Sequence, residues 1–159
     1  KRHPFVFNQE NKVKNIDSMQ NWESIKQKEK KRINFLDGVP KYLPALIRAW
    51  RIQEKAASIG FDWKEINPIR NKINEELYEL DVACKSGNLE EITDELGDVL
   101  FSIVNLGRFL NINSEEALRK TISKFETRFS GVEKRLKKMG KSLEEATLEE
   151  MDELWELEK

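Results

Sequence analysis

The sequence predicts an all-α protein, and three observations carry that prediction. Charged residues make up 36% of the 159 residues and hydrophobic residues 38%, a balance that suits helices with solvated outer faces. The chain holds only 7 Gly and 4 Pro, so long stretches contain no helix breaker. Apolar residues recur at helical spacing in these stretches, and no segment shows the alternation typical of a strand.

Glycine and proline residues divide the chain into a leading segment and one helical domain. Residues 1–17 show neither helical period nor strand alternation and are expected to be an irregular tail, followed by a Lys-rich helix. The segment "FLDGVPKYLP" carries one Gly and two Pro, which predicts a loop and the best domain boundary. We therefore expect a tail and linker helix at 1–35 and a domain at 36–159. The predicted helices are those at about 18–32, 44–59, 68–87, 89–110, 114–139 and 147–158.

Most of the predicted helix ends have a recognisable signal. Gly60 and Gly87 follow helical segments, as glycines commonly do at a C-terminus. Asn67, followed by a proline, predicts the start of one helix, and Asn88 predicts the start of the next. Two further starts have the spacing of a capping box, Asn113 with Glu116 and Thr147 with Glu150.

Composition excludes several classes of function. Lys and Arg number 28 against 29 Asp and Glu, so no overall field attracts nucleic acid or an anionic membrane. No apolar run approaches the roughly 20 residues of a membrane span. With a single cysteine, Cys84, no internal disulfide can form, and the expected location is the cytoplasm. The one histidine, His3, lies in the tail, so a catalytic triad with a His base is not available.

One carboxylate interrupts the apolar stripe of the segment after Pro68. At about 100° per residue, Glu76 falls in the middle of the stripe that Ile73 and Leu80 help to form, and Glu79 lies on its edge. Glu75 points about 100° away from Glu76, toward solvent. A lone buried carboxylate is costly, so Glu76 is expected to have a cation or a network of donors beside it.

The next helix carries a matching pair in "EITDELGDVLF". Glu95 and Asp98 lie along one border of its apolar stripe, while its opposite side is also apolar, which predicts a position central in a bundle or at a subunit interface. A turn at residues 87–88 predicts an antiparallel hairpin that sets Glu79 level with Glu95 and Glu76 level with Asp98. All four carboxylates then meet about 12–16 Å from the turn. Such a group of oxygens would suit Mg²⁺, although a solvated acidic face has the same spacing.

Cations in the sequence suggest phosphate chemistry at this site. Mg²⁺ commonly binds through a few carboxylates together with substrate phosphates. Lys72 lies one turn before Glu76, and Lys124 and Arg128 stand four residues apart on one helix, where they could meet one anion. Trp155 could stack on a base. A solvated basic face and a core aromatic residue are the alternative interpretations.

Read together, "NEELYEL" and "DELGDVLF" form EExxE, a gap of 15 residues and ExxD, and this pattern resembles the MazG family of nucleoside triphosphate pyrophosphohydrolases. The likeness extends through "LDGVPKYLPALIRAWRIQEKAASIGFDW", "LFSIVNLGRFLNINSEEALRKTISKFETRF" and "GKSLEEATLEEMDELW", and it is strongest to the C-terminal half of the two-domain bacterial protein. It implies a MazG-like helical bundle, and it implies that residues 1–35 are what remains after a missing N-terminal domain.

The resemblance also implies an activity and a set of roles. The enzyme would split a nucleoside triphosphate into a monophosphate and pyrophosphate, with Mg²⁺, in a bundle completed by dimerisation or a higher homo-oligomer. It implies metal ligands at Glu76, Glu79, Glu95 and Asp98. It implies nucleotide contacts at Lys72, Lys124, Arg128 and Trp155, with Glu75 as a supporting acid. A narrower pyrophosphatase, for dUTP, dCTP or phosphoribosyl-ATP, and a non-catalytic helical interaction module remain alternatives.

Overall fold

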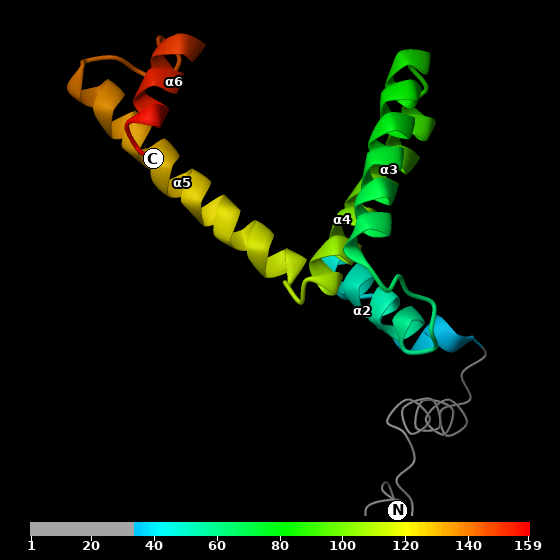
Figure 1. The fold of residues 1–159 in the computed structure, drawn as a ribbon. Coiled ribbons are helices and arrows are strands. Elements are labelled where there is room, and N and C mark those ends of the chain that lie inside the picture. Colours follow the sequence, from blue (N-terminus) through cyan, green and yellow to red (C-terminus); the bar gives the residue numbers. More distant parts are fainter. Residues whose placement is uncertain (1–33) are drawn as a thin grey trace, which may run out of the picture. The chain divides into compact units, whose positions relative to one another are not determined.

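The computed structural model describes residues 34–159, which form five α-helices and one short 3₁₀-helix, with no strand in that range (Figure 1). The all-α prediction is thus confirmed, while the predicted tail and the predicted helix at 18–32 lie outside the described residues. In chain order the elements are η1 Phe35–Gly38, α2 Ala45–Ala57, α3 Ile66–Ser86, α4 Leu89–Phe109, α5 Ser114–Lys138 and α6 Leu148–Glu156.

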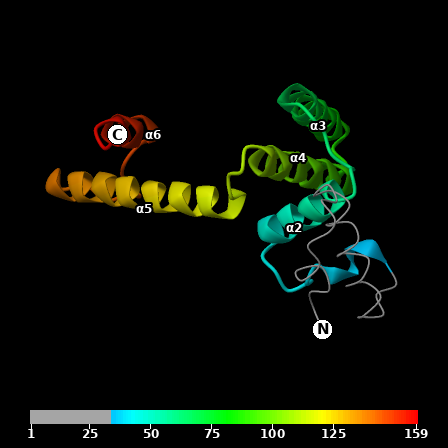
Figure 2. The ribbon, with the colours of Figure 1, turned by 60° about the horizontal axis from the view of Figure 1, so that its bottom comes forward.

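The chain divides into two compact units, one ending at Asn111 and one spanning Ile112–Lys159. In the first unit α4 packs against both α2 and α3, and η1 packs against α2. This central place agrees with one of the two positions predicted for a helix that is apolar on two sides. In the second unit α6 lies along α5 (Figure 2).

A two-residue turn joins α3 to α4 and makes them an antiparallel hairpin. Gly87 ends α3 with φ of +73°, in the left-handed region that disfavours side chains, and its N–H donates to the Ala83 carbonyl. Asn88 begins α4, and its side-chain oxygen accepts from the Glu90 N–H at 3.1 Å. Both predicted ends are confirmed, and α3 and α4 pack closely along each other.

The start of α3 differs from the prediction. The residue before the first helical turn is Glu65, so the helix begins at Ile66 and not after Asn67. Pro68 therefore occupies the third helical position. That position is tolerated because the first N–H groups of a helix have no acceptor within it, so the N–H that proline lacks is not missed.

A second difference is the short helix η1, which lies within the segment predicted as a loop. Asn34 and Asp37 cap it reciprocally, and the Asn34 N–H donates to the Asp37 carboxylate at 2.8 Å. A single turn of this kind has no apolar period of its own, so the spacing of apolar residues could not reveal it.

The starts of α5 and α6 follow the sequence signals. The Asn113 side-chain oxygen accepts from the Glu116 N–H at 3.1 Å. At α6 the Glu150 N–H donates to the Thr147 hydroxyl at 3.3 Å, and the Thr147 N–H donates to the Glu150 carboxylate at 2.9 Å, which is a full capping box. Both helices thus have a side-chain acceptor for one of the free N–H groups of their first turn.

The apolar core is small in each unit. In the first unit it consists of Ile69, Ala83, Val99 and Val104, and in the second of Val132 and Leu136. Within residues 34–159 no helix combines the length and the apolar character needed to cross a bilayer.

Candidate metal centre

Three carboxylates from the hairpin come together at one place. Glu76 and Glu79 lie one turn apart on α3, Glu95 lies on α4, and one oxygen of each falls within 4.8 Å of the others. The antiparallel register expected from the turn at Gly87 places Glu79 opposite Glu95. The hairpin geometry therefore explains the convergence.

The members of this trio differ in exposure. Glu76 is 5% exposed, between the buried residues Ile69 and Ala83 on the same helix, as its place in the stripe predicts. Glu95 is half-buried and Glu79 is exposed. Asp98, the fourth predicted ligand, is exposed and is not part of the trio. The cluster therefore has a buried end at Glu76 and an end open to solvent at Glu79.

Lys72 is the cation that accompanies the buried carboxylate. Its Nζ lies 2.8 Å from Glu76 Oε1 and 2.8 Å from Glu75 Oε1. Hydrogen bonds to Glu75 and then to Glu76 raise the pKa of Lys72 above its usual range, so the ammonium stays charged. Glu75 itself is exposed, as predicted, and it holds Lys72 from the solvent side.

The acids of the trio shift each other's pKa values in opposite directions. The pKa of Glu76 lies below its usual value because Lys72 donates a hydrogen bond to it, which outweighs the effect of burial. The pKa of Glu79 is raised, first by its hydrogen bond with Glu76, then by some loss of hydration and by the charges of Glu76 and Glu95. The trio thus concentrates negative charge that a proton or a cation would relieve.

The chemistry of these donors fits a hard divalent cation. All three are carboxylate oxygens, and neither histidine nor thiol belongs to the group. Mg²⁺ and Ca²⁺ favour such ligands, and Mg²⁺ usually completes its shell with waters or phosphate oxygens. Because Glu79 is exposed, that end of the trio is accessible to such a ligand.

The remaining predicted residues belong to the second unit. Lys124 is exposed on α5. The guanidinium of Arg128 lies 5.7 Å from the centre of the Trp155 ring, which is half-buried. The Phe125 ring also lies 5.1 Å from that ring at a tilt of 46°. Phe125 was not among the predicted site residues, although Phe125 and Phe129 stand four residues apart and stack at 5.8 Å.

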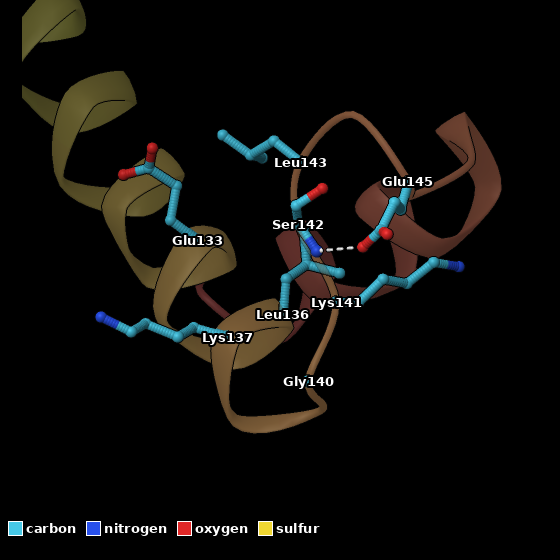
Figure 3. A pocket seen from close by; sticks show the side chains of 8 residues that line it. All are labelled: Glu133, Leu136, Lys137, Gly140, Lys141, Ser142, Leu143 and Glu145. Atoms are coloured by element: carbon cyan, nitrogen blue, oxygen red, sulfur yellow. Dashed lines mark hydrogen bonds between the residues drawn. The ribbon is translucent and has the colours of Figure 1, made fainter.

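Two surface hollows of the second unit lie away from these residues. One, of about 470 Å³, is at the C-terminal end of α5, where the Ser142 N–H donates to the Glu145 carboxylate at 2.9 Å (Figure 3). The other, of about 540 Å³, lies between α5 and the end of the chain and is lined in part by Arg135 and Glu158. None of the predicted site residues lines either hollow.

A comparison with protein families finds the MazG nucleotide pyrophosphohydrolase domain over residues 65–132. That range contains the whole carboxylate hairpin together with Lys72, Lys124 and Arg128, and it ends before Trp155. The match therefore covers both helices that supply the trio.

Curated relatives match almost the whole chain. The nucleoside triphosphate pyrophosphohydrolase/pyrophosphatase MazG of Thermotoga maritima is 46% identical over 158 residues, which is 98% of this chain and 59% of that protein. The nucleoside triphosphate pyrophosphohydrolase of Escherichia coli K12 is 37% identical over 161 residues, 98% of this chain and 61% of that protein. An uncharacterized protein of Bacillus subtilis, YabN, is 42% identical over 158 residues, 98% of this chain and 32% of that protein. The chain thus spans about three fifths of the first two relatives, and its residues 65–132 match the MazG nucleotide pyrophosphohydrolase domain.

Proposed function

We propose that this chain hydrolyses nucleoside triphosphates to a nucleoside monophosphate and pyrophosphate, using Mg²⁺ held by Glu76, Glu79, Glu95 and Asp98. The observation that carries the proposal is the meeting of three carboxylate oxygens within 4.8 Å on the α3–α4 hairpin. Asp98 is included among the ligands only because of its position in the ExxD motif. The names of two relatives, both nucleoside triphosphate pyrophosphohydrolases, support the same reaction.

The chemistry that Mg²⁺ supplies at such a site is polarisation of a phosphoryl oxygen and activation of a water for attack at the α-phosphorus. The chain's own side chains provide the rest. Lys72 keeps Glu76 ionised and fixes its direction through a 2.8 Å contact. Glu75 holds the other side of the same ammonium at 2.8 Å, so the Lys72 position is set from two directions.

In the second unit, we assign nucleotide contacts to Lys124, Arg128 and Trp155. Lys124 and Arg128 are one turn apart on α5 and can bind phosphate oxygens. Trp155 offers a ring that is already flanked by Phe125 and by Arg128. A flat ring held in this way is suited to stack against a base.

We also propose that a second copy of the chain completes the helical bundle. Four apolar side chains on the central helix α4 remain open in the single chain, each between 43% and 48% exposed: Leu96, Leu100, Phe101 and Ile103. Apolar side chains gathered on one helix in this way are typical of an interface. Sedimentation equilibrium of the purified chain tests this, and a monomer at micromolar concentration would contradict it.

The reaction is tested by measuring pyrophosphate and orthophosphate release from each nucleoside triphosphate, with Mg²⁺ and with a chelator. We expect one pyrophosphate per monophosphate, with release abolished by the chelator and restored by excess Mg²⁺. Orthophosphate as the first product would place the cleavage at another bond. Rates across the panel of bases also separate a general enzyme from a narrow dUTP or dCTP pyrophosphatase, because that preference depends on hydrogen bonds to the base.

A further inference from the structure

The C-terminal end of the second unit is fastened to α5 by a contact that the proposed reaction does not use. At Gly131, in the C-terminal half of α5, an added Cβ would lie 2.3 Å from Cδ and 2.3 Å from Oε2 of Glu158. The Glu158 carboxylate therefore rests against the backbone of α5, and only a glycine leaves room for it. A glycine inside a helix is ordinarily unfavourable, so this close approach gives it a structural reason.

The same carboxylate is also held by charge. Arg135, one turn after Gly131 on the same face of α5, donates from Nε to Glu158 Oε1. The Glu158 side chain is 25% exposed, so the pair is partly shielded from water. Steric fit at Gly131 and the ion pair with Arg135 thus fix Glu158 at one point of α5, and we call this three-residue contact the latch.

The latch is connected directly to Trp155. The Glu158 N–H donates to the Trp155 carbonyl at 3.1 Å, so the two residues belong to one turn of backbone at the end of α6. The other end of α6 is held by Glu150, which accepts from the Lys141 ammonium and from the Thr147 N–H. With both ends fastened, α6 can keep the Trp155 ring beside Phe125 and Arg128.

We propose that Glu158 is a positioning residue: seated against Gly131 and paired with Arg135, it holds Trp155 in the orientation that contacts the nucleotide. This inference rests on the proposed function, because it assigns the latch a part in binding the same substrate. Glu158 acts through Trp155 and does not itself touch the reacting atoms.

Two variants open the latch in different ways. Glu158→Ala removes the carboxylate. Gly131→Ala keeps the carboxylate but places a methyl group where the carboxylate now lies. Because the displaced group is the end of a flexible side chain, α5 itself need not move. Glu153→Ala is the matched control, since it removes an exposed glutamate from α6 without touching the latch.

The first measurement is the fluorescence of Trp155. The chain has four tryptophans, so each variant is compared with its own Trp155→Phe counterpart and the difference spectrum isolates Trp155. Opening the latch exposes the ring to water, and we expect a red shift in Glu158→Ala and in Gly131→Ala but not in Glu153→Ala. This measurement needs no catalytic activity.

The second measurement is steady-state pyrophosphate release. Loss of a well-placed stacking contact weakens nucleotide binding, so we expect KM to rise about 3- to 10-fold while kcat stays within about twofold. The double variant Gly131→Ala/Glu158→Ala should be no worse than Glu158→Ala alone, since the added methyl then has no carboxylate to displace. A purely structural role would predict no selective effect on KM.

The outcomes separate the latch from the reaction. A red shift with raised KM and a non-additive double variant supports the proposal. An unchanged spectrum, an unchanged KM, or a change in kcat alone overturns it. If the unaltered chain releases no pyrophosphate, the proposed function fails, and the absence or presence of the spectral shift still decides whether the latch holds Trp155.

Discussion

Glu76→Gln is the sharpest test of the carboxylate trio. The change replaces one oxygen by an amide nitrogen of similar size at a side chain that is 5% exposed, so it creates no cavity. Lys72 keeps its second partner, Glu75, at 2.8 Å, so no cation is left alone. What disappears is one of three negative charges and one anionic ligand. The hairpin should therefore keep its structure while the metal centre loses a ligand.

The expected loss of activity follows from the removal of one of the three carboxylate ligands. Removing only an outer hydrogen-bond partner of a metal ligand typically costs 10- to 100-fold, so replacing an inner ligand should lower kcat/KM by about 100-fold or more. A 100-fold loss corresponds to about 2.7 kcal/mol of transition-state stabilisation. The assay is pyrophosphate release over a range of Mg²⁺ concentrations, with circular dichroism and urea unfolding to show that the helices remain.

The matched control is Asp94→Asn. Asp94 immediately precedes Glu95 on α4, is exposed, and lies outside the trio, so its replacement removes the same unit of charge without removing a ligand. We expect its activity to stay within about twofold of the unaltered chain. If Glu76→Gln instead keeps both its rate and its Mg²⁺ dependence, Glu76 is not a ligand and the reasoning from the trio is refuted.

Three further predictions concern stability. Leu136→Ala, at a side chain 1% exposed, should lower the free energy of unfolding in urea by about 2–5 kcal/mol. Leu148→Ala, at 74% exposure, should change it by less than about 0.5 kcal/mol, and equal effects would contradict the assigned core. Gly87→Ala forces a side chain to φ of +73° and should cost about 1–2 kcal/mol in the same assay; no loss would mean that the turn has another conformation. The pKa of Glu150 is held below its usual value by hydrogen bonds from Lys141 and then from the backbone, so its stabilisation is present above its ordinary pKa of 4.5 and lost as pH falls below it. Glu150→Gln should therefore flatten the decline of unfolding free energy below pH 4.5, and an unchanged slope would reject this role.

The site was predictable from sequence where local rules dominate. The burial of Glu76 follows from its phase on α3, because a residue seven positions from both Ile69 and Ala83 returns to the same helix face. The meeting of Glu79 with Glu95 follows from a short turn at Gly87, since a tight hairpin pairs residues at equal distances from it. Both inferences need only the helical period and one turn signal.

The rest depended on information that periodicity does not contain. Asn67 and Pro68 have the composition of a helix start, but the first turn admits a proline at more than one position, so the true start two residues earlier was missed. The latch could not be predicted from the sequence, because Glu158 and Gly131 are far apart in the chain and neither fits a motif. Only the packing of α6 on α5 brings them together.

The tight turn between α3 and α4 also limits how the hairpin can change length. One residue added between Asn88 and Glu95 would swing Glu95 by about 100° around its helix and shift it by about 1.5 Å. An insertion of a whole turn restores the direction but moves the oxygen by about 5.4 Å, which exceeds the 4.8 Å that now spans the trio. If the three oxygens are to stay close enough to share one ion, an insertion between the turn and the carboxylates in α4 must therefore be matched by an insertion of equal length in α3.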